Sequence, residues 1–167
     1  METSLLYCLN VYDCHSNLAF IMIAKNNPFN IRYNVANNWL GQTGQHKGFC
    51  EFDTMEHGLR AAIVLLKNDV YRKDLQTVAK VVSRFAPSYE NDTSSYIRFV
   101  SDGLRSAGHN PDDLRTSFIL EYDMTFFYLL KYMAKMETGY SFTYLDYSLI
   151  VRKYGLKKEL YGHIADK

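Results

Sequence analysis

Three short stretches of turn-forming residues, at 26–33, 39–42 and 48–53, constrain the fold of this chain more than any other feature. The first reads Asn-Asn-Pro-Phe-Asn-Ile-Arg-Tyr, and the second contains the only tryptophan, Trp39. Asn-Pro initiates turns, and the residue before a proline is pushed out of the helical region. These stretches therefore predict a structured loop, the kind of segment on which sites tend to lie. The alternative is a loop that carries no site and is held in shape by its own amide side chains, because such a loop would have the same composition.

The remaining sequence predicts a mostly α (α+β) fold, built as a single domain over residues 1–167. Glycines at 41, 44 and 48 suggest a short β-hairpin within the loop region 26–52. Helical spacing and capping residues predict helices at 53–70, 74–86, 92–108, from 110, at 123–139 and at 144–153. The helix at 123–139 is apolar on more than one face, which is typical of a buried helix. Residues 1–25 form an N-terminal segment, and its apolar run at 18–23 fits either a strand or a short helix. Residues 157–167 form a polar tail.

Composition excludes some classes of function and favours others. Lysine and arginine number 19 against 18 acidic residues, which disfavours a nucleic-acid partner. The 14 tyrosines and 10 phenylalanines suit a glycan-binding cleft, since aromatic faces stack on sugar rings, although a core and its rim would use most of them as well.

The chain lacks the signals of secretion, membrane insertion and metal binding. Its three cysteines are odd in number and widely spaced, as expected of synthesis in a reducing cytoplasm. The apolar run at 18–24 is too short to span a bilayer, and no cation precedes it as in a signal peptide. The five histidines have no ligand spacing, and no nucleotide-binding or serine-hydrolase motif is present. We expect no metal, no cofactor and no membrane span, and delivery by a route other than a standard signal.

Two carboxylates, Glu137 and Glu90, stand out by position, and Asp92 lies beside the second. Glu137 ends the most apolar helix, where apolar surroundings would raise its pKa as a general acid requires. An exposed glutamate paired with a lysine is the simpler reading. Glu90 lies in a polar loop just before a helix, and Asp92 follows it; for both, helix capping is the simpler explanation.

Several blocks in fixed order carry a resemblance to a known family. They are Asn-Asn-Pro-Phe-Asn-Ile-Arg, Trp-Leu-Gly-Gln, Gly-Phe-x-x-Phe-Asp, Gly-Leu-Arg-Ala, Arg-Phe-Ala-Pro, Glu-Asn-Asp-Thr-x-x-Tyr-Ile and Met-x-Thr-Gly, between residues 26 and 140. The chain resembles virion structural or lysin-like proteins of phages and prophages, which are grouped with lysozyme-like peptidoglycan hydrolases. The resemblance implies a lysozyme-like helical domain.

A weaker resemblance points to bacterial glucosaminidases. Asn30-Ile31-Arg32 with Trp39 and Gly41 is similar to their cleft segment, but their catalytic glutamate lies upstream, on a helix ending Glu-Ser-Gly. Here Glu137-Thr138-Gly139 is similar to that helix end and comes after the cleft segment. A circular permutation, with Glu137 folded back over the loop at 26–48, would reconcile the two orders.

These resemblances imply an enzyme that cleaves the glycan strands of peptidoglycan: a lysozyme, glucosaminidase or lytic transglycosylase. Glu137 would be the general acid, and Glu90, or else Asp92, the second carboxylate. The sugar subsites would be lined by Asn27, Asn30, Arg32, Trp39, Gln42 and Tyr96. The alternatives are a non-catalytic wall-binding or virion structural module, and a wall-degrading toxin of a contractile secretion system. Expected partners are peptidoglycan and virion or secretion-apparatus proteins, with synthesis in the bacterial cytoplasm and action at the wall after release or injection, or within a virion.

Overall fold

The computed structural model of the chain describes residues 22–88, 92–115 and 120–156. Most of the apolar run predicted at 18–23, the tail at 157–167 and Glu90 lie outside these residues. The elements in chain order are β1 (Gln42–His46), β2 (Phe49–Phe52), α1 (Met55–Lys67), the π-helix η1 (Asn68–Arg72), α2 (Val78–Phe85), α3 (Thr93–Ser106), the 3-10 helix η2 (Leu120–Tyr122), α4 (Met124–Thr138) and α5 (Tyr144–Lys153). The predicted α+β class, mostly helical with one hairpin, is confirmed.

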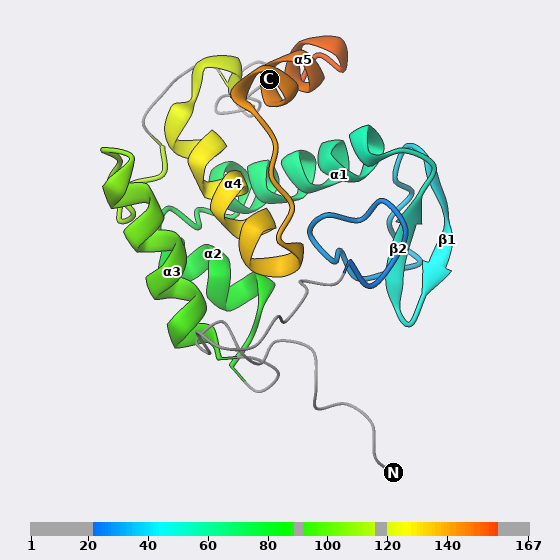
Figure 1. The fold of residues 1–167 in the computed structure, drawn as a ribbon, viewed down its shortest axis with the longest axis horizontal. Helices are drawn as coiled ribbons and strands as arrows, with labels where there is room; N and C mark the ends of the chain where they lie inside the picture. Colours follow the sequence, from blue (N-terminus) through cyan, green and yellow to red (C-terminus); the bar gives the residue numbers. More distant parts are fainter. Residues whose placement is uncertain (1–21, 89–91, 116–119, 157–167) are drawn as a thin grey trace, which may run out of the picture.

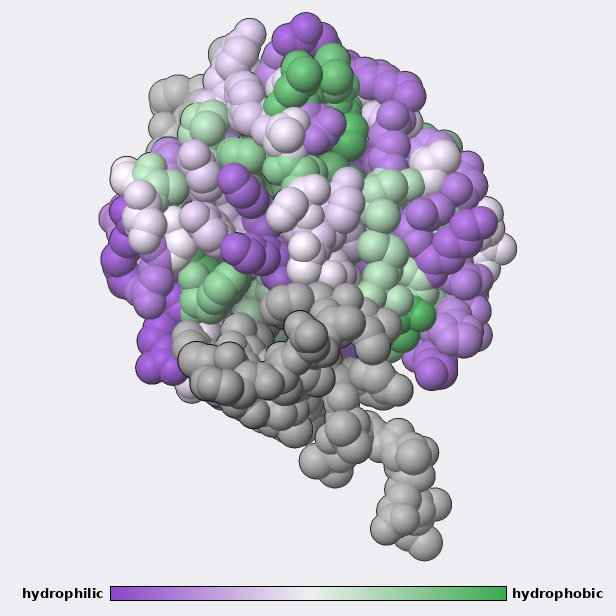
Figure 2. All heavy atoms as spheres, viewed as in Figure 1, coloured by the Kyte–Doolittle hydropathy of each residue, from purple (hydrophilic) through white to green (hydrophobic). Residues whose placement is uncertain are grey.

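The hairpin and the helices occupy different sides of the molecule. In Figure 1 the two strands lie at one side, and the loop that precedes them lies between the strands and the last turn of α4. Buried residues of this loop, of β2 and of the five α-helices form one hydrophobic cluster. The hairpin side of the view is mostly hydrophilic, whereas apolar spheres gather over α5 (Figure 2).

The two strands pair antiparallel, with His46 opposite Phe49 and Gln42 opposite Phe52. Lys47 and Gly48 both have positive φ, 50° and 82°, as expected for a tight two-residue hairpin turn. An isolated bridge between Arg32 and Phe49 adds the preceding loop to the edge of the hairpin. This pairing fixes where the amide-rich loop lies.

Helix α1 begins one residue later than its capping pattern predicts. The N-cap is Thr54, whose hydroxyl accepts a hydrogen bond from the backbone N–H of His57, and not Asp53, at which the predicted helix begins. A capping box formed by Asp53 with Glu56, which the sequence spacing also suggests, is therefore wrong. Asp53 instead lies 2.6 Å from Nδ1 of His57. A Cβ on Gly58 would lie 1.9 Å from the carbonyl oxygen of Asn26, so the glycine lets the loop approach α1 closely.

Two predicted helix starts are replaced by irregular backbone. Asp74 adopts positive φ of 59° instead of capping a helix, and α2 begins at Val78 after its N-cap Thr77. Residues 110–115 form a turn rather than the predicted helix. The N–H of Val78 bonds to the carbonyl of Pro111, and the N–H of Leu114 to the carbonyl of Gln76. These tertiary hydrogen bonds satisfy backbone groups that a local helix would otherwise pair.

The boundaries of α4 and α5 follow the sequence signals. Asp123 caps α4 by accepting from the N–H of Phe126 at 3.0 Å, and Gly139 ends the helix with φ of 70°. Thr143 and Asp146 form a capping box at the start of α5. Cap and glycine together place Glu137 in the last turn of a helix that packs on α1 and α3.

Candidate functional site

Glu137 lies where the C-terminal end of α4 meets the amide-rich loop. The adjacent Thr138 donates its hydroxyl to the carbonyl of Pro28 at 2.9 Å, with the carbonyl of Ala134 as a second acceptor at 3.3 Å. Thr138 and Pro28 are 110 positions apart in the sequence. The contact brings the end of α4 against the loop, as the permuted arrangement requires.

Asn30 makes the direct contact with Glu137. Its Nδ2 donates to the backbone carbonyl of Glu137 at 3.2 Å and lies 3.5 Å from the carboxylate Oε2. Its Oδ1 accepts from the N–H of Ile23 at 3.2 Å. Asn30 has a φ of 45°, a left-handed conformation that asparagine tolerates better than most residues. The residue predicted as a sugar ligand therefore holds the candidate acid.

Asn27, also predicted to line a subsite, is fully buried and used within the loop. Its Nδ2 donates to the carbonyls of Ile31 and Cys50, and its Oδ1 accepts from the N–H of Ile31 at 2.8 Å. Asn26 similarly donates to the carbonyls of Phe52 and Asp53. Both amides fix the backbone, so part of the asparagine content is explained by a loop held by its own side chains.

The surroundings of Glu137 favour its protonated form. The side chain is half-buried, and this burial raises its pKa from 4.5 to about 7. Hydrogen bonds from Tyr96 and Asn30 and the positive charge of Arg32 act in the opposite direction and lower the pKa by smaller amounts. An acid with a pKa near neutrality can both hold and release a proton at pH 7.

Tyr96 and Arg32 approach Glu137 from two different elements. Tyr96 ends the first turn of α3 and is buried, so its ring is part of the core while its hydroxyl reaches the carboxyl. Arg32 is exposed on the loop, with its guanidinium 5.3 Å from the centre of the Phe49 ring. The structure thus brings Asn30, Arg32 and Tyr96 around Glu137.

Trp39 and Gln42 lie at the start of the hairpin. Trp39 packs against the core, and the N–H of Gln42 bonds to its carbonyl at 3.1 Å. Trp39 Nε1 and Gln42 Oε1 are enclosed, and neither has a hydrogen-bond partner within the described part of the chain. Buried polar atoms of this kind cost about 1–3 kcal/mol each when they stay unpaired, and buried water molecules are their usual partners.

The two candidates for a second carboxylate differ in what the structure shows. Glu90 lies outside the described residues. Asp92 is exposed and caps α3, where its Oδ1 accepts from the N–H of Ser95 at 3.1 Å. Hydrogen bonding to Ser95 lowers the pKa of Asp92, so it is ionised at pH 7. The backbone carbonyl of Asp92 accepts a hydrogen bond from the N–H of Tyr96. Asp92 therefore lies one helical turn before Tyr96, whose hydroxyl contacts Glu137.

The contribution of Thr138 is not evident from the sequence. The triplet Glu-Thr-Gly reads as a helix end, and nothing local indicates that its hydroxyl reaches the carbonyl of Pro28. Among the described residues, no group of three or more histidine, cysteine, aspartate or glutamate side chains could hold a metal ion. In the same residues no helix is long and apolar enough to cross a membrane.

Comparison with known proteins gives one informative similarity. No model of a known protein family matches the chain. The chain is 33% identical over 85 residues to protein P5 of Pseudoalteromonas phage PM2, and the match covers 48% of this chain and 52% of P5. The chain thus spans about half the length of this relative. The similarity supports a phage origin.

Proposed function

We propose that this protein cleaves the glycan strands of bacterial peptidoglycan, with Glu137 as the general acid. The observation that carries the proposal is the half-buried carboxyl at the end of α4, whose pKa is raised to about 7. It lies against the loop whose motif is similar to the cleft segment of glucosaminidases. The phage similarity adds a biological context in which wall cleavage is needed.

In this proposal Glu137 protonates the glycosidic oxygen as the bond to the leaving sugar breaks. The acid becomes a carboxylate, and the groups around it suit that change. Asn30 Nδ2 and the Tyr96 hydroxyl donate to the anion, and the charge of Arg32 favours it. Burial favours the protonated state before transfer and these groups favour the ionised state after it, which is the balance a general acid needs.

The second group depends on the type of enzyme. Glu90, or Asp92 in its place, would act as nucleophile or as base for a water molecule. A separation of about 5 Å from Glu137 would give retention and several ångströms more would give inversion. A lytic transglycosylase needs only one carboxylate, because a hydroxyl of the sugar attacks. Arg32, Trp39 and Gln42 remain the candidates for contact with sugar, whereas Asn27 acts through the shape of the loop.

A non-catalytic wall-binding or virion structural module is the second candidate. The commitment of Asp92 to capping α3 favours it, because it leaves Glu137 without a demonstrated partner acid among the described residues. The partly exposed side chains of Trp39 and Gln42 would suit sugar binding without chemistry equally well. A toxin delivered by a contractile secretion system would share the chemistry of the first candidate and differ in its route to the wall.

The variant Glu137→Gln tests the proposal. It keeps the shape of the side chain but removes the proton donor, so we expect wall clearing to fall at least about a hundredfold, the usual contribution of a general acid. The melting temperature at pH 5 should stay within about 2 °C, because Glu137 is already protonated there in the folded state.

Mass spectrometry of the digest would identify the cut bond and distinguish reducing ends from anhydro-sugars. Full clearing by Glu137→Gln would remove this residue from the mechanism. Co-sedimentation of the wild-type protein with purified peptidoglycan, without release of any product, would favour the binding module.

A further inference from the structure

The hydroxyl of Thr138 joins three segments of the chain at the end of α4. It donates to the carbonyl of Pro28 in the amide-rich loop at 2.9 Å, and the carbonyl of Ala134, one turn back in α4, is a second acceptor at 3.3 Å. The N–H of Tyr140, just after the helix, donates to the same hydroxyl oxygen at 3.3 Å. Thr138 is buried, so little water can replace these bonds. The hydroxyl therefore links the helix, the turn that follows it and the loop.

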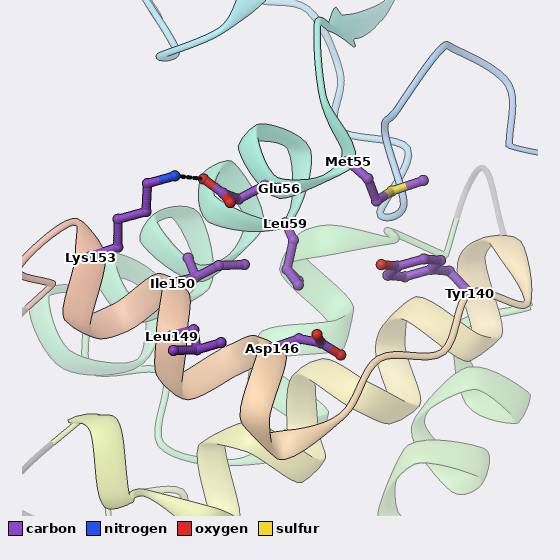
Figure 3. A pocket seen from close by; sticks show the side chains of 8 residues that line it. All are labelled: Met55, Glu56, Leu59, Tyr140, Asp146, Leu149, Ile150 and Lys153. Carbon is purple, nitrogen blue, oxygen red and sulfur yellow. Dashed lines mark hydrogen bonds and ion pairs between the residues drawn. The ribbon is translucent and has the colours of Figure 1, made fainter.

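The turn after α4 also has attachments that do not involve the hydroxyl of Thr138. Gly139 ends the helix in the left-handed conformation, with φ of 70°. The ring of Tyr140 stacks on the ring of buried Phe142, with 6.0 Å between their centres. Tyr140 also lines a hollow between α1 and α5, together with Leu59 of α1 (Figure 3). Loss of the hydroxyl should therefore leave the end of α4 in place and release mainly the loop.

The loop reaches Glu137 through Asn30, only two residues after Pro28. The N–H of Ile23 donates to Asn30 Oδ1 at 3.2 Å, which directs the other end of the amide, Nδ2, toward Glu137. This Nδ2 lies 3.5 Å from the carboxylate of Glu137, at the upper limit of a hydrogen bond. The Cα atoms of Pro28 and Asn30 are at most about 7 Å apart, so a displacement of Pro28 also displaces Asn30. A small movement of the loop is therefore enough to remove the donor from the acid.

We propose that Thr138 is a positioning residue, whose bond to Pro28 holds the loop so that the Asn30 amide stays within reach of the Glu137 carboxyl. Thr138 acts through the loop and makes no contact with the carboxyl through its hydroxyl. This inference rests on the proposed function, because the position of the donor affects cleavage only if Glu137 is the general acid. The donor then favours the anion that forms when the acid gives up its proton.

Three substitutions of Thr138 test the proposal. Thr138→Val and Thr138→Ala remove the hydroxyl, whereas Thr138→Ser keeps it, and circular dichroism checks that each variant folds. The pKa of Glu137 is followed by the ¹³C shift of its carboxyl in an NMR titration of the full chain. We expect this pKa to rise by about half a pH unit in the valine and alanine variants and to stay at the wild-type value in the serine variant. Because the effect passes through Asn30, adding Asn30→Gly to Thr138→Val should cause no further rise.

Thr125→Val is the matched control. The Thr125 hydroxyl is also buried in α4 and lies 2.8 Å from Nδ1 of His109. Thr125 precedes Glu137 by 12 residues, about 18 Å along the helix axis. The control should lower the melting temperature, as Thr138→Val does, without changing the titration of Glu137. An equal change of the titration in both variants would overturn the inference. An unchanged titration in Thr138→Val, or a rise that adds to that of Asn30→Gly, would also overturn it.

The titration needs no substrate, so it separates this inference from the proposed activity. Full wall clearing by Glu137→Gln would refute the activity, while a titration changed by Thr138→Val and restored by Thr138→Ser would still support the positioning role. If Glu137 is the acid, wall clearing by Thr138→Val should fall about tenfold, since small errors of position are costly in catalysis, and Thr138→Ser should restore it. Clearing that falls in Thr138→Val with no change of the titration would contradict the inference.

Discussion

Glu137 and Asp92 are carboxylates at opposite kinds of helix end. Glu137 is in the last turn of α4, half-buried, and its pKa is raised by desolvation to about 7. Asp92 precedes the first turn of α3, is exposed, and its pKa is lowered by hydrogen bonding to Ser95. The helix dipole acts in the same directions, since a C-terminus disfavours negative charge and an N-terminus favours it.

The difference shows that the position of a carboxyl group on a helix decides whether it is held as an anion or as an acid. At an N-terminus the backbone N–H groups use the carboxylate as a cap, and its charge contributes to stability. At a C-terminus no backbone donor of the helix is available, so the surrounding loop must supply donors, as Asn30 does. A carboxylate held in this second way is less stable as an anion and more useful as an acid.

The largest expected effect is a loss of stability with rising pH that Glu137 causes and Asp92 does not. Folded Glu137 has a pKa of about 7, against the ordinary value of 4.5 in an unfolded chain, so the folded state binds more protons between these values. Stability therefore falls as pH rises from about 4.5 to 7. Glu137→Gln removes this loss, and urea denaturation should show the variant gaining up to about 3 kcal/mol on the wild type between pH 5 and pH 8.

Asp92→Asn is the control for that measurement. Because the pKa of Asp92 is lowered, its stabilising effect is present above its unfolded pKa and is lost only as pH falls through the folded value. The difference between Asp92→Asn and the wild type should stay constant from pH 5 to pH 8. A constant difference for Glu137→Gln as well would show that Glu137 is ionised in the folded state at pH 5.

A smaller effect separates the cap from the chemistry at Asp92. Serine is also a good N-cap but carries no charge, whereas alanine cannot cap. We expect Asp92→Ala to lower the melting temperature by about 3 °C and Asp92→Ser to change it little. Wall cleavage should stay within about twofold in both, since the geometry commits Asp92 to α3. A loss of cleavage of about a hundredfold in Asp92→Ser, with the fold intact, would instead make Asp92 the second carboxylate.

The sequence predicts the helices that depend on local signals and misses the features that depend on tertiary contacts. The ends of α4 at Asp123 and Gly139 are predicted correctly, because a cap and a terminal glycine each act within one turn. The predicted range of α5 is correct as well. The helix expected at residue 110 is wrong because Val78 and Leu114 bond across to another segment. No local pattern reveals a competing partner at that distance.

In the candidate site, too, the sequence predicts what local signals decide and misses what tertiary contacts decide. The apolar helix and its terminal glycine single out Glu137, and motif order predicts that it lies close to the loop at 26–33. The sequence does not separate the roles of the amides, since Asn26, Asn27 and Asn30 look alike in it. Only the fold distinguishes the amides that hold backbone from the one that holds the acid.

The smallest expected effect tests that distinction directly. Asn30 and Asn26 both have positive φ, 45° and 56°, so glycine replaces either without backbone strain and removes only the amide. Asn30→Gly removes a donor to the Glu137 carboxylate, so the pKa of Glu137 should rise above 7 by about half a unit, measured by the ¹³C shift of the carboxyl during an NMR titration. Asn26→Gly loses the two hydrogen bonds from the side-chain amide to the carbonyls of Phe52 and Asp53, but it keeps the contact of Asn30 with Glu137. It should therefore lower stability without changing the titration of Glu137. Equal shifts in the two variants would mean that Asn30 affects the acid only through the shape of the loop, and the contrast between a capped and a loop-held carboxylate would then depend on burial alone.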